Sequence, residues 1–110
     1  MAYDEDLAER IRELLATDHD VAEKKMFGGL AFLIGGHLSV SASGRGGLLL
    51  RCDPDETDAL IHQPHVGRFE MRGREMDGWL RVQHDAVAED GALRHWVDVG
   101  LTFARSLPPK

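Results

Sequence analysis

The sequence predicts an α+β domain of two layers, in which helices cover one face of an antiparallel sheet. Three observations predict this class: stretches with apolar residues at helical spacing, runs in which apolar and polar residues alternate, and glycine pairs between those runs. The predicted order of elements is α-β(3)-α-β(2)-α. With 110 residues, the chain is expected to form a single domain over residues 1–110.

Apolar residues repeat at helical spacing near both ends of the chain. The first stripe, in residues 4–16, consists of Leu7, Ala8, Ile11, Leu14 and Leu15. The second stripe, in residues 89–107, consists of Leu93, Trp96, Val97, Gly100, Leu101, Ala104 and Leu107. Both stripes predict amphipathic helices that bury one side.

A third, shorter helix is predicted in the middle of the chain. Asp53 can cap its first turn, Pro54 fits the first helical position, and Glu56 completes the spacing of a capping box. Pro64 ends this helix, because proline lacks the N–H that a helix interior needs.

The strands are predicted from alternation and from glycine turns. Residues 23–34 are expected to form one long strand that bulges or bends at Gly28-Gly29. Gly35 and Gly36 then make a two-residue hairpin turn, because both can adopt positive φ. The remaining strands are predicted over residues 37–43, 48–52, 66–74 and 78–83. A turn around Asp77-Gly78 is expected to join the last two of these strands.

Charge is unevenly distributed along the chain. The net charge is −6, which disfavours indiscriminate binding to nucleic acid. Residues 24–52 and 66–84 are nevertheless basic, with eight Lys and Arg against three Asp and Glu. A local basic surface is therefore compatible with the acidic whole.

Strand alternation predicts where the basic side chains point. If the apolar strand residues face the helices, the opposite sheet face is exposed and carries Arg51, Arg68, Arg72, Arg74, Trp79 and Arg81. Two interpretations stay open. This face is either the mixed-charge solvated face that antiparallel sheets routinely have, or a binding site for an acidic or anionic partner.

Residues with catalytic or ligand-binding chemistry form no recognisable pattern. The glycine-rich loop at residues 44–47 matches no phosphate-binding motif and leads into a strand. His62 and His65 stand on either side of the predicted helix end, which is poor spacing for zinc. Cys52 lies in acidic surroundings and is interpreted as a small buried residue. We therefore expect a protein that is no enzyme and has no cofactor and no metal.

The cellular compartment is predicted from the cysteine count and from hydropathy. A single cysteine excludes an internal disulfide and fits a reducing cytoplasm. The apolar stretches are shorter than the roughly 20 residues of a membrane-spanning helix. We expect a cytoplasmic protein with no membrane partner.

Several segments together resemble the N-terminal domain family of the TfoX/Sxy proteins. The resemblance starts with the segment KKMFGGLAF at residues 24–32 and covers roughly residues 4–108. It continues through Gly35-Gly36, residues 49–51, residues 53–57, residues 69–71, Gly78-Trp79, Trp96-Val97 and residues 103–105.

The resemblance implies the α+β fold of secretion-chaperone-like domains, in the order given above. The founding members are bacterial regulators of competence for DNA uptake that act with the transcription machinery. They carry a second, helical domain, whereas this chain stops at Lys110. We interpret it as a stand-alone N-terminal domain, to which a competence role does not carry over. The resemblance implies no catalytic residue, and the structural motif consists of Met26, Phe27, Gly28, Gly29, Gly35 and Gly36.

The leading hypothesis is a small regulatory or interaction module whose partner is a protein. A homodimer is an open alternative, because exposed sheet edges and faces can pair. The competing hypothesis is a nucleic-acid-associated module that uses the arginine face with Trp79, and its affinity would fall steeply with added salt. An enzyme or metal protein is the least favoured hypothesis.

Overall fold

The computed structural model describes residues 3–18, 20–26, 28–71 and 73–109. Its helices are α1 (Glu5–Leu14), α2 (Thr57–Leu60) and α3 (Asp90–Ser106), with the 3₁₀ turns η1 (Pro54–Glu56) and η2 (His84–Val87). Its strands are β1 (Val21–Met26), β2 (Gly29–Ile34), β3 (His37–Ala42), β4 (Leu48–Arg51), β5 (Val66–Met71) and β6 (Arg74–Val82). Within the described residues they form one antiparallel sheet in the order β1-β2-β3-β4-β6-β5. The α+β class is confirmed.

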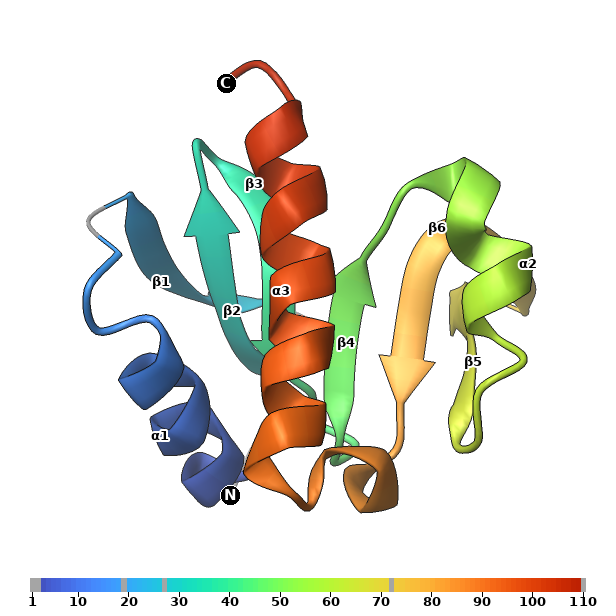
Figure 1. Ribbon diagram of the computed structural model, residues 1–110, viewed down its shortest axis with the longest axis horizontal. Helices are drawn as coiled ribbons and strands as arrows, with labels where there is room; N and C mark the ends of the chain where they lie inside the picture. The colour runs from blue at the N-terminus through green and yellow to red at the C-terminus, as the bar shows by residue number, and fades with distance from the viewer. Residues whose placement is uncertain (1–2, 19, 27, 72, 110) are drawn as a thin grey trace.

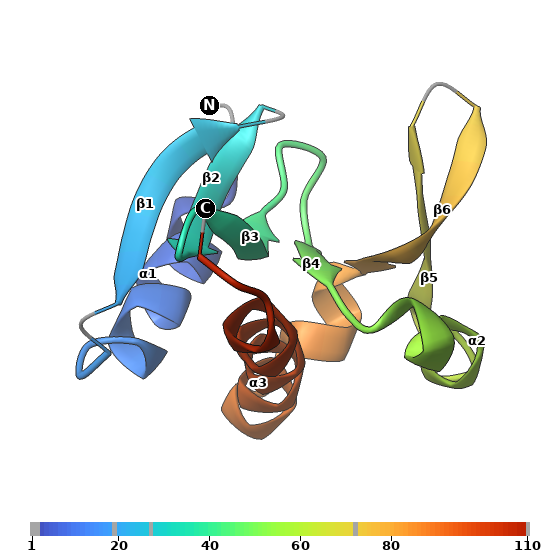
Figure 2. The same ribbon diagram turned by 90° about the horizontal axis from the view of Figure 1, so that it is seen from above.

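The helices and the sheet form two layers. Figure 1 shows α1 and α3 in front of the sheet, with α3 running across β3 and β4. Figure 2 shows the sheet curling so that the outer hairpins, β1–β2 and β5–β6, reach away from α3. The short α2 lies beside the β5–β6 end, where it packs on β6. None of the helices in the described ranges has the length and apolarity needed to cross a membrane.

The core lies between the helices and the sheet. Both predicted stripes face it, because Leu7, Ile11, Leu93 and Val97 are almost completely buried. The sheet supplies a second set of fully buried side chains, among them Phe32, Val40, Leu48, Leu50, Leu80 and Val82. The sides that the sequence predicts as buried are therefore buried, but in β2, β3 and β4 the opposite face is largely buried as well: Ser39, Ser41 and Leu49 are at most 3% exposed.

Capping side chains fix where two helical segments begin. The Asp4 carboxylate accepts a hydrogen bond from the Leu7 backbone N–H at 3.1 Å, at the start of α1. The Asp53 carboxylate does the same for the Asp55 N–H at 2.9 Å, and Pro54 occupies the first position of η1. Each cap pairs a backbone donor that the helix itself leaves unpaired.

The prediction of one long strand over residues 23–34 is wrong, and so is the strand count of three before the second helix. The structure has four strands there, because β1 and β2 form a hairpin in which Met26 pairs with Gly29. Gly28 has φ 76°, a conformation that favours glycine, so the glycine signal marks a turn rather than a bulge. Phe27 lies outside the described residues.

The second hairpin of the sheet follows the prediction. Ile34 pairs with His37, and the two residues between them, Gly35 and Gly36, have φ 58° and 86°. Two consecutive positive φ angles match the twist of a two-residue hairpin turn.

The turn between the last two strands lies five residues before its predicted place. Met71 pairs with Arg74, so the chain turns between these two residues, and the signal at Asp77-Gly78 lies in a bulge inside β6. Gly78 has φ 83°, and its N–H donates to the Thr57 hydroxyl at 2.8 Å. Asp-Gly therefore marks a residue with positive φ here, which both bulges and turns require.

Replacing Thr57 by valine is expected to lower the free energy of unfolding by about 1–2 kcal/mol, because the buried Gly78 N–H loses its acceptor. Thr57→Val keeps the volume of the side chain, so packing changes little. The control is Thr102→Val on the exposed side of α3, expected within about 0.5 kcal/mol of the parent. Urea denaturation of both variants measures the difference, and equal stabilities would contradict the role of this bond.

The helix α3 approaches the sheet most closely at Gly100. A Cβ atom at this position would lie 2.5 Å from the Ser39 carbonyl oxygen and 2.7 Å from Val40 Cγ1. Both distances are below van der Waals contact, so the absence of a side chain sets the spacing between α3 and β3.

Candidate functional site

Arg68 does not lie on an open sheet face. Its cross-strand partner Leu80 is fully buried, which places Arg68 on the side that faces the helices. There its guanidinium forms ion pairs with Asp58 of α2 and with Asp77, the latter at 2.8 Å. The hydrogen bond to Asp77 raises the pKa of Arg68 above its usual value, and the bond to Asp58 adds to it. Its charge is thus matched within the domain.

Arg51 lies between two aromatic rings. Its Cζ atom is 5.0 Å from the ring centre of Trp79 and 5.2 Å from that of Phe103 in α3. Phe69 extends the cluster, with its ring centre 6.4 Å from that of Trp79. Cation–π attraction favours this stacking, and Nε of Arg51 is buried without a hydrogen-bond partner in the described residues. Arg51 therefore links the sheet to α3.

The other predicted arginines have separate positions. Arg81 donates to the Ser43 hydroxyl and to the Arg45 carbonyl oxygen, both at 3.1 Å, and so holds the loop between β3 and β4. Arg74 is exposed beside the turn that precedes β6. Arg72 lies outside the described residues.

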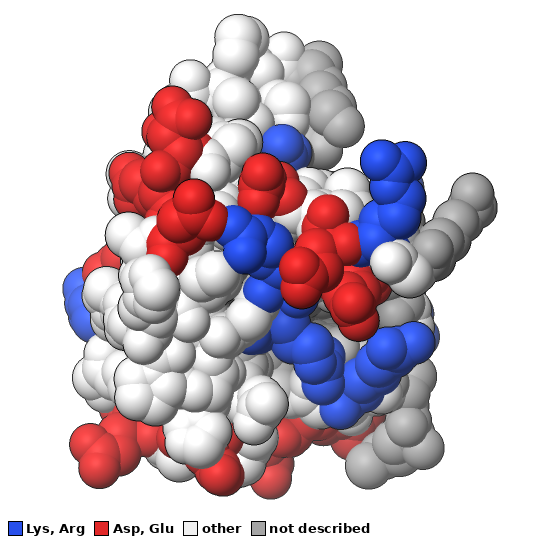
Figure 3. Space-filling model, turned by 90° about the vertical axis from the view of Figure 1, so that its right-hand side faces the viewer, with Lys and Arg blue, Asp and Glu red and all other residues white. Residues whose placement is uncertain are grey.

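The prediction that these arginines share one face of the sheet is therefore wrong. The structure brings Arg51 and Trp79 together and leaves Arg81 on the same side of β6 as Trp79, because both alternate with buried residues. Arg68 lies on the other side. Figure 3, which shows the side of the molecule over α2, β5 and β6, has acidic side chains interleaved with the basic ones. Between the pairs Arg68↔Leu80 and Phe69↔Met76, three residues of β6 (77–79) have no partner in β5, so simple alternation does not carry from one side of this bulge to the other.

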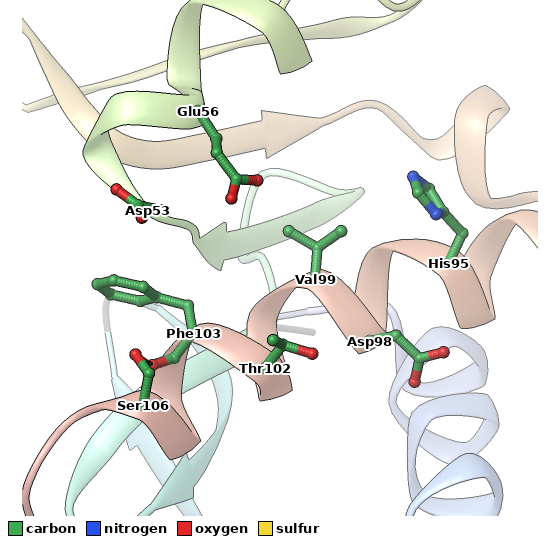
Figure 4. A pocket seen from close by; sticks show the side chains of 8 residues that line it. All are labelled: Asp53, Glu56, His95, Asp98, Val99, Thr102, Phe103 and Ser106. Carbon is green, nitrogen blue, oxygen red and sulfur yellow. Dashed lines mark hydrogen bonds between the residues drawn. The ribbon is translucent and has the colours of Figure 1, made fainter.

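A groove that the sequence reasoning missed lies between α3 and η1. It encloses a cavity of about 360 Å³. Figure 4 shows the side chains of η1 and its cap on one wall and those of α3 on the other. The lining residues are Asp53, Glu56, His95, Asp98, Val99, Thr102, Phe103 and Ser106.

Two apolar side chains give this groove its contact surface. Val99 and Phe103 are half-buried and stand four residues apart, outside the stripe by which α3 packs on the sheet. Because residues at this spacing lie on one side of a helix, the pair could have been recognised as a second apolar strip. The Arg51 guanidinium stacks over the Phe103 ring and so ties this side chain to the end of β4.

The walls of the groove are negatively charged. Glu56 and Asp98 are exposed, and in the described part of the chain neither forms an ion pair. Asp53 adds a third carboxylate, which also caps η1. The sign of this charge is opposite to that of the predicted arginine site.

The groove offers no obvious nucleophile–base pair. Ser106 donates its hydroxyl proton to the Phe103 carbonyl oxygen at 2.6 Å. His95 stands seven residues before Thr102 on the same helix, which separates their backbones by about 10 Å. That separation exceeds the reach of a direct hydrogen bond. In the ranges that the structure describes, no group of three or more His, Cys, Asp or Glu is placed to hold a metal ion.

Cys52 is buried beside Thr57. Burial raises the pKa of its thiol above the usual value, and the hydrogen bond with Thr57 only partly opposes this. We expect Cys52 to react with a soluble disulfide reagent at pH 8 at least about tenfold more slowly in the folded protein than in urea. Absorbance of the released thiolate measures both rates, and free cysteine under both conditions is the control. Equal rates would contradict burial of the thiol.

The comparison with known families identifies the domain. The model of the TfoX N-terminal domain matches residues 13–104, which is most of the chain. No curated protein and no solved structure matches the chain. The match spans α3 up to Ala104 and therefore includes most of the groove. The chain belongs to the TfoX N-terminal domain family.

Proposed function

We propose that this domain is a non-enzymatic protein-interaction module with a regulatory role, and that it binds its partner in the groove between α3 and η1. One observation supports this most: Val99 and Phe103 form an apolar strip that is bordered by the carboxylates of Glu56 and Asp98, for which the described residues supply no ion-pair partner. An aromatic anchor within a polar rim is the usual composition of a protein interface.

The packing of α3 on the sheet holds this apolar strip in a fixed position, which favours binding. Phe103 belongs to a 17-residue helix whose opposite side packs on the sheet, so its position is fixed before a partner arrives. A preformed surface loses little conformational entropy on association, and this favours affinity.

The regulatory part of the proposal rests on the family. By resemblance to the founding TfoX/Sxy members, we propose a role in the control of transcription, and the single cysteine fits a cytoplasmic location. A nucleic-acid partner is less well supported, because the charge of Arg68 is matched by Asp58 and Asp77. The net charge of −6 also opposes association with phosphates.

Photo-crosslinking tests the proposal. A benzophenone amino acid replaces Thr102 in the groove, and a control domain carries it at Glu75, an exposed position in β6. After irradiation in an extract of the source cells, we expect protein adducts at position 102 that are absent at position 75 and that survive nuclease treatment. An adduct of twice the domain's mass would identify a second copy as the partner.

Two results would contradict this function. If neither position forms a protein adduct, the domain does not act as an interaction module through this groove. If the adducts disappear after nuclease treatment, nucleic acid holds the complex together and the competing hypothesis replaces ours.

A further inference from the structure

The groove continues beyond the residues described so far. A second cavity of about 340 Å³ lies at the other end of α3. Its lining residues are Gln63, Pro64, His65, Ala86, Ala92, His95 and Trp96. His95 lines both cavities, so they meet at this side chain. We call the combined surface, from Ala92 to Ser106, the α3 groove.

The length of the α3 groove sets the size of its occupant. Fourteen helical steps separate Ala92 from Ser106, and at 1.5 Å per residue they span about 21 Å. This distance corresponds to about six residues of an extended chain. A segment of a protein has this dimension, whereas a metabolite of ordinary size would fill only one of the two cavities.

The two halves of the α3 groove differ in polarity. The half near Ala92 is mostly apolar and contains Pro64, Ala86 and the edge of Trp96. The His95 ring packs edge-on against Trp96, with 4.9 Å between the ring centres, and forms the boundary. The half near Ser106 contains the carboxylates. The α3 groove therefore presents apolar contacts along its length and negative charge towards one end.

Nothing among the lining residues neutralises that charge. Neither cavity has a lysine or arginine in its described lining. Some carboxylates elsewhere on the domain do have a cation beside them: Arg105 bridges Asp18 and Asp20, and Arg12 bridges Glu9 and Glu23. The carboxylates of Glu56 and Asp98, which form no ion pair with any described residue, are thus available to an outside cation, and they favour a partner of the opposite charge.

We propose that the α3 groove binds a basic, apolar segment of a partner protein, with its apolar side chains along Ala92, Val99 and Phe103 and its lysine or arginine against Glu56 and Asp98. This inference rests on the proposed function and specifies the chemistry of the partner. Apolar contact supplies most of the affinity, and the charge pairs supply orientation and selectivity against acidic segments.

A selection from randomised 12-residue peptides displayed on messenger RNA tests the inference on the full chain. We expect enriched peptides to combine at least two lysines or arginines with apolar residues. The variant E56K/D98K is expected to bind them about tenfold more weakly, because two attractive charges become repulsive. The control E13K/E75K changes the net charge equally at exposed positions outside the α3 groove and is expected to bind within about twofold of the parent.

The neutral variant E56Q/D98N preserves side-chain shape and keeps the test valid if the lysine variant folds poorly, which thermal melting reports. Enriched peptides that are acidic, or that bind E56K/D98K as tightly as the parent, would overturn this inference while leaving an interaction module in place. Failure to enrich any peptide, together with the absence of crosslinked protein at position 102, would overturn the proposed function as well.

Discussion

Replacing Phe32 by alanine is expected to lower the free energy of unfolding by about 3–5 kcal/mol. The Phe32 side chain is 1% exposed and is the largest of the fully buried ones in the described residues. It belongs to the core cluster that also contains residues of α1 and α3, so its removal leaves a void between the two layers. A loss of this size is a large share of the total stability that a domain of this length has.

Urea denaturation followed by circular dichroism measures this effect. Leu33→Ala is the matched control, because Leu33 is the next residue in the same strand but is only half-buried. We expect it to lower the stability by about 1 kcal/mol. Equal losses at the two positions would show that the core does not lie where we place it.

The second large effect is expected at Gly100. A valine there adds a Cβ and two methyl groups where even the Cβ would meet the Ser39 carbonyl oxygen at 2.5 Å. The helix must then move away from β3, and we expect Gly100→Val to lower the free energy of unfolding by about 3 kcal/mol. The α3 groove would change shape with it, because the same helix forms its wall.

Gly91→Val in the same helix is the control for Gly100→Val. A Cβ at position 91 would meet no atom within 4 Å, so the substitution is expected to stay within about 0.5 kcal/mol of the parent. Thermal and urea denaturation of the two variants separate close packing from helix propensity. A Gly100→Val protein as stable as Gly91→Val would contradict the close approach of α3 to the sheet.

The fold was predictable wherever local chemistry and burial agree. Gly35 and Gly36 are at the hairpin turn that their conformational freedom predicts, and Asp4 and Asp53 cap the segments that follow them. The apolar stripes of α1 and α3 are buried as expected. These features depend on neighbouring residues alone, which is why the sequence reveals them.

The errors arose where one sequence signal serves two structures. Gly28 suits a bulge within a strand and a turn between strands equally well, because both use positive φ. Gly78 presents the same ambiguity: the sequence predicts a turn there, and the structure has a bulge. Only pairing with another strand decides between the two, and strand pairing is a tertiary property.

Only part of the candidate site could be predicted from the sequence. Alternation correctly places Trp79 and Arg81 on the face opposite to Leu80, but it fails for Arg68, which pairs with Leu80 at the edge of the bulge. The stacking of Arg51 on Phe103 joins residues 52 positions apart, and no local pattern reveals it. The α3 groove depends on η1 and α3 being neighbours in space, which strand order determines.

The pairing of β4 with β6 has a consequence for local opening. The outer hairpin joins the rest of the sheet through the four residue pairs from Leu48↔Val82 to Arg51↔Trp79. Much of β5 and of the first half of β6 is only partly buried, so detaching this hairpin exposes less apolar surface than unfolding the whole domain. Amide protons of β5 should therefore exchange with deuterium sooner than those of β3, through an opening that leaves α1 and α3 on the remaining strands.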